Sequence, residues 1–276
     1  MNLLVELGKI DAQTWITVGI VAGIVSLIAI LIVVAILVVS KVFKVDTDEK
    51  MSLILERLAG ANCGGCGCSG CSGFACKLAT GEAKLDDCHV TSDEQKQEIA
   101  NILGIKIEKT ARTVAVVNCN GGENAGTAFE YSGNLTCAYK NSLLGGDKVC
   151  KFGCLGCGDC ATVCPEHCIK IENGVAKIDA NACISCGTCI LTCPKNIISR
   201  IPASAPVYVA CSSHCKGKEV MGACKVGCIA CGLCAKKCPQ NAITMIDNLP
   251  VIDYEKCNGC KTCVGVCPRH TIIERY

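Results

Sequence analysis

The chain has few of the residues on which most globular cores and most ligand sites depend. Only 4% of its 276 residues are aromatic, and only four are histidine, without metal-ligand spacing. It has no basic stripe interleaved with stacking aromatics, so we expect no nucleic-acid partner. No Gly-x-Gly-x2-Gly follows an expected strand, no P-loop occurs, and no nucleophile is paired with a base. The sequence therefore predicts neither a nucleotide site nor bond-making catalysis.

Cysteine is the residue in excess, with 29 copies. Disulfides are disfavoured because the count is odd and many cysteines lie two or three residues apart, in a segment expected to be cytoplasmic. Zinc sites usually use two separated Cys-x2-Cys pairs, whereas this chain places three cysteines on one loop before a Cys-Pro. Small modules with few aromatics also need more than hydrophobic burial to be stable. These features favour iron–sulfur clusters.

Four runs of the form Cys-x2-Cys-x2-Cys-x3-Cys-Pro occupy the second half of the chain. This is the run of bacterial ferredoxins, in which three thiolates bind one [4Fe–4S] cluster and the fourth binds the neighbouring cluster when runs are paired. The expected ligand sets are Cys154, Cys157, Cys160 and Cys193; Cys183, Cys186, Cys189 and Cys164; Cys228, Cys231, Cys234 and Cys267; and Cys257, Cys260, Cys263 and Cys238.

Each pair of runs belongs to one copy of an internal duplication. We call residues 114–204 the first copy and residues 205–276 the second copy. A β-hairpin is predicted in each, at 169–179 and 243–253, the first around the two-residue turn signal Asn173-Gly174. Two tandem two-cluster ferredoxin-like domains of α+β class are therefore expected.

A four-cysteine module, residues 58–104, is predicted ahead of the duplication. Its glycines free the backbone to wrap a cluster and leave amides to bond the cluster's sulfides. The expected ligands of this fifth [4Fe–4S] cluster are Cys63, Cys66, Cys71 and Cys88. Cys68 and Cys76 lie outside this spacing and are expected to be bystanders. A helix that begins after a Ser92 cap and ends at Gly104 is predicted to close the module.

The remaining cysteines leave the number of clusters open. Cys119, Cys137 and Cys150, with one neighbour, are candidates for a sixth cluster, and a seventh is possible on a second set of three. That second set is Cys211, Cys215 and Cys224. The alternative is that these residues, with Cys168, are small buried thiols or exchangeable ligands. At least five clusters are therefore expected, and six or seven if these cysteines also bind.

An uncharged apolar run covers residues 16–39 and is long enough to cross a membrane as a helix. A cleaved signal peptide is disfavoured because the leader is nearly neutral and no clear cleavage site follows. Positive charges follow the run at Lys41, Lys44, Lys50 and Arg57. By the positive-inside bias, residues 1–40 are predicted to be a single-pass anchor in the cell membrane, with the N-terminus outside and the iron–sulfur domains in the cytoplasm.

A linker helix is predicted over residues 41–57, between the anchor and the module. Leu53, Ile54 and Leu58 are expected to line its apolar face. This completes a predicted order of membrane helix, linker helix, small helical iron–sulfur module and two ferredoxin-like domains.

Over its whole length the chain resembles the B subunit of the Rnf complex, a membrane-bound ferredoxin:NAD+ oxidoreductase. The shared features are the single N-terminal membrane helix, the Cys-x2-Cys-x4-Cys-x16-Cys module and the ferredoxin repeats, and the most specific segment is Ala61-Asn-Cys-Gly-Gly-Cys66. The duplicated C-terminal half resembles the longer form found in anaerobes. Ser69 is a departure, because the family often has proline there.

This resemblance implies a non-catalytic electron-relay subunit of an ion-translocating oxidoreductase. Reduced soluble ferredoxin would be the donor, and electrons would pass singly through the [4Fe–4S] clusters to membrane subunits and then to a peripheral subunit that reduces NAD+. The flow would be coupled to outward pumping of Na+ or H+.

Two other functions fit fewer of these features. The chain could be a polyferredoxin subunit of another membrane-bound redox enzyme, such as a hydrogenase, or a membrane-tethered iron–sulfur redox sensor. The Cys63–Cys88 module and the anchor count against the first. A sensor does not need this many clusters in series.

Overall fold

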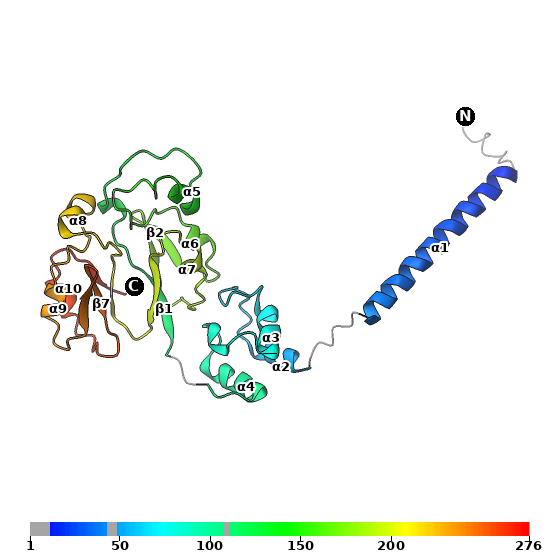
Figure 1. Ribbon diagram of the computed structural model, residues 1–276, viewed down its shortest axis with the longest axis horizontal. Coiled ribbons are helices and arrows are strands. Elements are labelled where there is room, and N and C mark those ends of the chain that lie inside the picture. Colours follow the sequence, from blue (N-terminus) through cyan, green and yellow to red (C-terminus); the bar gives the residue numbers. More distant parts are fainter. Residues whose placement is uncertain (1–11, 43–48, 108–110, 276) are drawn as a thin grey trace, which may run out of the picture. The chain divides into compact units, whose positions relative to one another are not determined.

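The computed structural model describes residues 12–42, 49–107 and 111–275 (Figure 1). The chain divides into two compact units, Met1–Asp48 and Glu49–Tyr276. Within the described residues, the first unit is a single helix. The second contains all 29 cysteines, and none of them forms a disulfide.

Helix α1 (Ala12–Val42) is the predicted apolar helix, and it has 31 residues. Its segment Trp15–Leu37 has 23 residues, none of them buried within the protein. At 1.5 Å per residue this segment is about 35 Å long, and a bilayer's hydrocarbon core is about 30 Å thick. A helix that is apolar on every side is suited to lipid rather than to water. Helix α1 is therefore a candidate membrane span.

Three helices and one 3₁₀ turn build the module that follows. They are α2 (Glu49–Arg57), α3 (Cys71–Thr80), η2 (Leu85–Asp87) and α4 (Asp93–Leu103). Their shared core is centred on the fully buried side chains of Ile54, Phe74 and Ile99. Helix α2 packs against α3 and α4, so residues 49–57 belong to the module rather than to a free linker.

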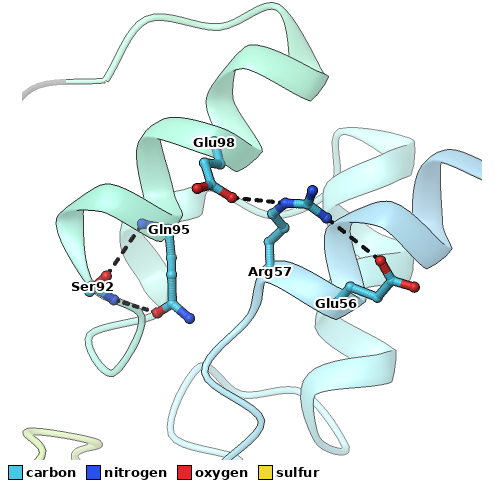
Figure 2. A network of polar contacts seen from close by, with 5 residues as sticks. All are labelled: Glu56, Arg57, Ser92, Gln95 and Glu98. Atoms are coloured by element: carbon cyan, nitrogen blue, oxygen red, sulfur yellow. Dashed lines mark hydrogen bonds and ion pairs between the residues drawn. The ribbon is translucent and has the colours of Figure 1, made fainter.

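The predicted boundaries of α4 are confirmed. The Ser92 hydroxyl accepts a hydrogen bond from the Gln95 amide at 3.3 Å, and the Gln95 side chain accepts one from the Ser92 amide at 3.0 Å (Figure 2). This reciprocal pair satisfies two of the unpaired donors at a helix start. Gly104 ends the helix in the left-handed conformation, with φ 72°.

The predicted apolar face of α2 is partly wrong. Ile54 and Leu58 are buried, but Leu53 is 42% exposed. Successive side chains on a helix point about 100° apart. When Ile54 points into the core, Leu53 therefore points sideways, toward solvent. On the polar side, Arg57 bonds Glu98 of α4 at 2.8 Å and lies 3.6 Å from Glu56, tying the two helices together (Figure 2).

The first copy contains two antiparallel strand pairs. Strand β1 pairs with β4 and β2 pairs with β3. Their bounds are β1 (Thr113–Val117), β2 (Ile169–Glu172), β3 (Val175–Ile178) and β4 (Ile198–Pro202). The predicted hairpin is confirmed, with Asn173 and Gly174 at φ 50° and 72°, the positive values that a type I′ turn requires. Its short helices are η3 (Gly122–Asn124), α5 (Cys137–Ser142), α6 (Asp159–Thr162) and α7 (Thr188–Thr192).

The second copy repeats this plan. Strand β5 pairs with β8, and the predicted hairpin is the pair β6–β7, which turns at Asp247 and Asn248. The elements are β5 (Val207–Val209), α8 (Gly217–Ala223), α9 (Leu233–Lys236), β6 (Ile243–Ile246), β7 (Leu249–Ile252), α10 (Thr262–Val266) and β8 (Ile272–Glu274). In each copy, the buried residues of the strands pack in one core cluster with cysteines of the runs.

Candidate metal centres

In the first copy, cysteines of the two runs share two cavities. The Cys154 cavity, counted together with the solvent at its open mouth, has a volume of about 390 Å³ and includes Cys160 and Cys193 on its wall. The Cys183 cavity has a volume of about 330 Å³ and is lined by Cys164, Cys183, Cys186 and Cys189. The last cysteine of each run therefore lies beside the first cysteines of the other run, the arrangement that crossed ligation requires.

The second copy repeats this exchange. The Cys228 cavity is lined by Cys228, Cys231, Cys234 and Cys267. The Cys257 cavity is lined by Cys238, Cys257, Cys260 and Cys263. Each has a volume of about 340 Å³, so the cavities of the two copies are similar in size and in donor type.

Local backbone geometry turns each run around its cavity. A residue with positive φ precedes the short helix of each run, for example Gly158 at 92° and Gly187 at 85°. This conformation reverses the chain, and the third cysteine of the run then lies buried on the helix, as Cys160 and Cys189 do. Glycine adopts such values without strain, which explains its place between the second and third cysteines of three runs, and in the fourth run Lys261 takes this conformation at φ 57°.

Backbone amides point at several of the cysteine sulfurs. The Cys183 sulfur accepts hydrogen bonds from the amides of Ala115, at 3.5 Å, and Ser185, at 3.4 Å. In the second copy the Cys267 sulfur accepts one from Thr271 at 3.3 Å. Such N–H groups stabilise thiolates and tune the potential of iron–sulfur clusters.

The thiol environment fits a group that binds thiolates. Burial raises the pKa of Cys154 to about 11 and that of Cys189 to about 12. These thiols would be protonated at neutral pH without a bound cation, and the positive charge of a metal group favours the thiolate. Among the described residues, no three His, Cys, Asp or Glu side chains are grouped closely enough to hold one metal ion.

The Cys154 cavity departs from the predicted ligand set. Cys137, not Cys157, lies on its wall. Both carboxylate oxygens of Asp159 accept hydrogen bonds at the start of α5, from the amides of Cys137 at 2.9 Å and Ala138 at 3.2 Å. The Cys137 and Cys157 thiols are neighbours, and burial together with the adjacent Cys137 raises the pKa of Cys157 to about 11. Spacing alone gave no signal for this pairing, which brings together residues from separate loops.

Cys168 adds a fifth thiol to the Cys183 cavity. Its sulfur lies 3.5 Å from that of Cys164. In the second copy the equivalent residue is Ala242, whose amide bonds the Cys238 sulfur at 3.4 Å. Cys168 is therefore an addition to the common pattern of the two copies.

The module holds its four expected cysteines in a half-buried setting. Burial raises the pKa of Cys63 and that of Cys66, and nearby Cys88 contributes to both shifts. The loop is closed by Asn62, whose side-chain oxygen accepts a hydrogen bond from the Cys71 amide at 2.9 Å. Of the two expected bystanders, Cys68 is half-buried and Cys76 is exposed.

The module loop also contacts the first copy. The Thr188 hydroxyl donates a hydrogen bond to the Cys63 carbonyl at 3.2 Å, and Gly65 packs against the backbone of Cys186. Cys186 lines the Cys183 cavity, and Thr188 lies between two other residues of its wall, Gly187 and Cys189. The module cysteines and the Cys183 cavity are thus neighbours in space.

The structure does not gather either of the two further three-cysteine sets expected from the sequence around one of these cavities. A fifth cavity instead brings together two cysteines from each copy: Cys119, Cys150, Cys211 and Cys224. Cys137 lies in the Cys154 cavity, and Cys215 lines none of these five cavities. Sequence order suggested grouping within a copy, whereas the fold groups equivalent positions across the two copies.

Comparisons with known families agree with this geometry. Residues 58–90 match the family described as "Putative Fe-S cluster", and residues 153–197 and 227–271 match "4Fe-4S dicluster domain". Together with α1, these matches define a multi-cluster iron–sulfur protein with a candidate membrane helix. The chain carries several [4Fe–4S] clusters and has the fold class predicted from its sequence.

Three relatives are similar along most of the chain. One, the B subunit of the Na(+)-translocating ferredoxin:NAD(+) oxidoreductase complex of Acetobacterium woodii, is 38% identical over 85% of this chain and 71% of its own length. The B subunit of the ion-translocating oxidoreductase complex of Methanosarcina acetivorans is 35% identical over 86% of this chain and 91% of its own. The B subunit of the proton-translocating ferredoxin:NAD(+) oxidoreductase complex of Clostridium ljungdahlii is 38% identical over 85% of this chain and 84% of its own length. The chain belongs to this family, the B subunits of Rnf complexes, which confirms the resemblance found in the sequence.

Proposed function

We propose that the chain is the electron-relay subunit of a membrane-bound ferredoxin:NAD+ oxidoreductase. It takes electrons from reduced ferredoxin and passes them to membrane subunits of the complex, and the flow is coupled to translocation of Na+ or H+. The observation that carries the proposal is the series of cysteine sites within one compact unit, in a chain of this family with a candidate membrane span. The chain carries electrons and does not itself catalyse the making or breaking of bonds in a substrate.

The ligands in this proposal are the twenty cysteines of the five expected sets. [4Fe–4S] clusters supply one-electron transfer over a wide range of potentials. The cysteine loops hold and orient them, the buried strands beneath exclude water, and the amides that bond sulfurs favour the charged thiolates. Contact between the Cys63–Cys66 loop and Cys186 supports the passage of electrons between the first copy and the module.

The second copy is the proposed docking face for ferredoxin. It has nine Lys and Arg residues against five Asp and Glu, whereas the first copy has seven of each. Cys231 and Cys260 are exposed in the second copy, and no cysteine of the first copy is exposed. A basic surface beside accessible thiol sites favours encounter with an acidic electron carrier.

Orientation follows from the charges beside α1. Lysines and an arginine follow the span, so the N-terminus lies outside and the second unit lies in the cytoplasm. This side is where soluble ferredoxin and NAD+ are available.

The test is anaerobic, ferredoxin-dependent NAD+ reduction by membranes with and without this chain, at two Na+ concentrations. Removing the chain, while the other subunits remain assembled, should abolish the activity. Restoring it with a Cys76→Ala variant, whose exposed thiol belongs to no expected set, should recover full rate. Na+ dependence would identify the ion, and activity that survives without the chain would refute the proposal.

A further inference from the structure

The inter-copy cavity, defined by Cys119, Cys150, Cys211 and Cys224, has the features of the four ferredoxin-type cavities. Counted together with the solvent at its open mouth, the space inside it is about 360 Å³, against 330–390 Å³ for the others. Four cysteines line it, and none belongs to the twenty expected ligands. It also contains Gly121, Gly153 and Gly227, where the backbone approaches the thiols.

The four cysteines occupy equivalent positions in the two copies. Cys119 follows strand β1 and Cys211 follows strand β5. Cys150 precedes Cys154 by the same spacing with which Cys224 precedes Cys228. The cavity therefore takes one matched pair of thiols from each copy.

Backbone amides are directed at its sulfurs in matching fashion. The Cys119 sulfur accepts hydrogen bonds at 3.4 Å from the amides of Gly121 and Cys154. The Cys211 sulfur accepts equivalent bonds from Ser213, at 3.5 Å, and Cys228, at 3.4 Å. The Cys183 sulfur likewise accepts hydrogen bonds from two amides, one of them two residues further along the chain. Two amide donors on each of two cysteines exceed what a small buried thiol needs, and they suit a thiolate bound to metal.

Backbone pairing between the copies builds the walls. Ala125 and Cys224 form an antiparallel bridge, flanked by a 2.9 Å hydrogen bond from the Lys225 amide to the Asn124 carbonyl. A second contact between the copies is the hydrogen bond that the Ser212 hydroxyl donates to the Asn118 carbonyl, at 2.7 Å. The four thiols are thus held in place by the junction itself.

The backbone comes into contact distance of the thiols at two glycines, and an added side chain would clash at one of them, Gly227. A Cβ at Gly121 would lie 3.4 Å from the Cys224 sulfur and 3.5 Å from the Cys119 sulfur. One at Gly227 would lie 2.5 Å from the Val220 side chain. The backbone therefore approaches the sulfurs closely, as in the glycine-rich loops of the other sites.

We propose that Cys119, Cys150, Cys211 and Cys224 bind a sixth [4Fe–4S] cluster that joins the two copies. On binding, each thiol gives its proton to solvent and each sulfur bonds one iron, so the protein neither gains nor loses an electron. The proposal deepens the proposed function, because Cys119 contacts the amide of Cys154 and Cys211 contacts the amide of Cys228. The site therefore lies between a ligand loop of each copy and links them into one electron path.

The test is metal and sulfide content of the full chain, purified anaerobically, with native mass spectrometry and EPR after reduction. Six clusters predict about 24 iron atoms and 24 sulfides per chain, and five predict about 20 of each. The double variant Cys150→Ala/Cys224→Ala should lose about four iron atoms and four sulfides per chain. Its integrated EPR signal should fall by about one unpaired electron per chain. The second pair, Cys119→Ala/Cys211→Ala, should give the same result. The matched control, Cys76→Ala/Cys215→Ala, removes two cysteines outside all five cavities and should keep the wild-type content.

The outcomes separate this site from the proposed function. About 20 iron atoms in the wild-type chain, zinc in place of iron, or unchanged iron in both double variants would overturn the sixth site. Loss of about eight or more iron atoms in both variants would also count against it, because the cysteines would then support the fold of the copies. If the wild-type chain holds about 24 iron atoms but membranes show no ferredoxin-dependent NAD+ reduction, the proposed function fails and the site stands.

Discussion

Gly65 lies directly against the backbone of Cys186, joining the iron–sulfur module to the first copy. A Cβ on Gly65 would fall 1.8 Å from the Cys186 carbonyl oxygen, so no larger residue fits without a backbone shift. Overpacking of this kind costs about 1–3 kcal/mol. Gly65→Ala should therefore weaken the junction and slow ferredoxin-dependent turnover. The equilibrium constant for contact between the module and the first copy should fall about tenfold for each 1.4 kcal/mol. Hydrogen exchange at residues 62–66 and 185–188, with steady-state turnover, measures both effects.

Gly222→Ala is the matched control for this substitution. Gly222 lies in helix α8, and an added Cβ there meets no atom within 4 Å. It should leave exchange and turnover at the wild-type level. Equal behaviour of the two variants would show that the Gly65 contact does not hold the junction.

Cys137 gives the Cys154 cavity a spare thiol beside Cys157. We expect Cys157→Ala to keep its cluster, with an altered EPR spectrum, because Cys137 can take the vacant position. The double variant Cys137→Ala/Cys157→Ala should lose about four iron atoms per chain. The equivalent second-copy substitution, Cys231→Ala, is the comparison, since the Cys228 cavity is lined by its four expected cysteines alone. Iron loss from Cys157→Ala as large as that from Cys231→Ala would refute the exchange.

The sequence predicted those parts of the molecule that local chemistry determines. The Asn173-Gly174 turn requires positive φ at both residues, and the Ser92 and Gln95 pair satisfies donors within one helix turn, so both could be read from short segments. The four repeated runs likewise predicted most of the cysteines that line each of the four ferredoxin-type cavities.

Contacts between distant segments could not be predicted in this way. Cys119, after strand β1, and Cys224, at the end of helix α8, meet only at the junction of the two copies, and no local spacing records that meeting. Cys137 reaches the Cys154 cavity through the Asp159 carboxylate of another loop. Leu53 is exposed because α2 packs inside the module, and the direction of that packing depends on α3 and α4. In each case tertiary packing, rather than residue type, decided the outcome.

The capping box of α4 predicts a local stability effect within the module. Ser92→Ala removes the hydroxyl that accepts the Gln95 amide, and loss of such a cap costs about 1 kcal/mol. Hydrogen exchange of amides in Asp93–Leu103 should become about fivefold faster. Gln97→Ala, an exposed substitution on the same helix, is the control and should change exchange little. Unchanged exchange in Ser92→Ala would mean that core packing around Ile99 alone sets the stability of α4.

Lys236 and Lys237 test the docking face proposed for ferredoxin. Both are exposed beside Cys238, on and after helix α9 of the basic second copy. Reversing their charge with Lys236→Glu/Lys237→Glu should slow association with an acidic ferredoxin, raising its KM about tenfold at low salt. The difference from wild type should shrink as ionic strength rises, because salt screens exposed charges beyond about 10 Å at 0.1 M.

The matched control makes the same change of net charge elsewhere. Lys77→Glu/Lys170→Glu alters two exposed lysines, one in the module and one in the first copy. If the second copy receives ferredoxin, this control keeps a KM near wild type while the Lys236/Lys237 variant does not. Equal increases in KM would mean that ferredoxin responds to the net charge of the whole chain. An increase in the control alone would move the docking face to the module and the first copy, and electrons would then enter the series at its other end.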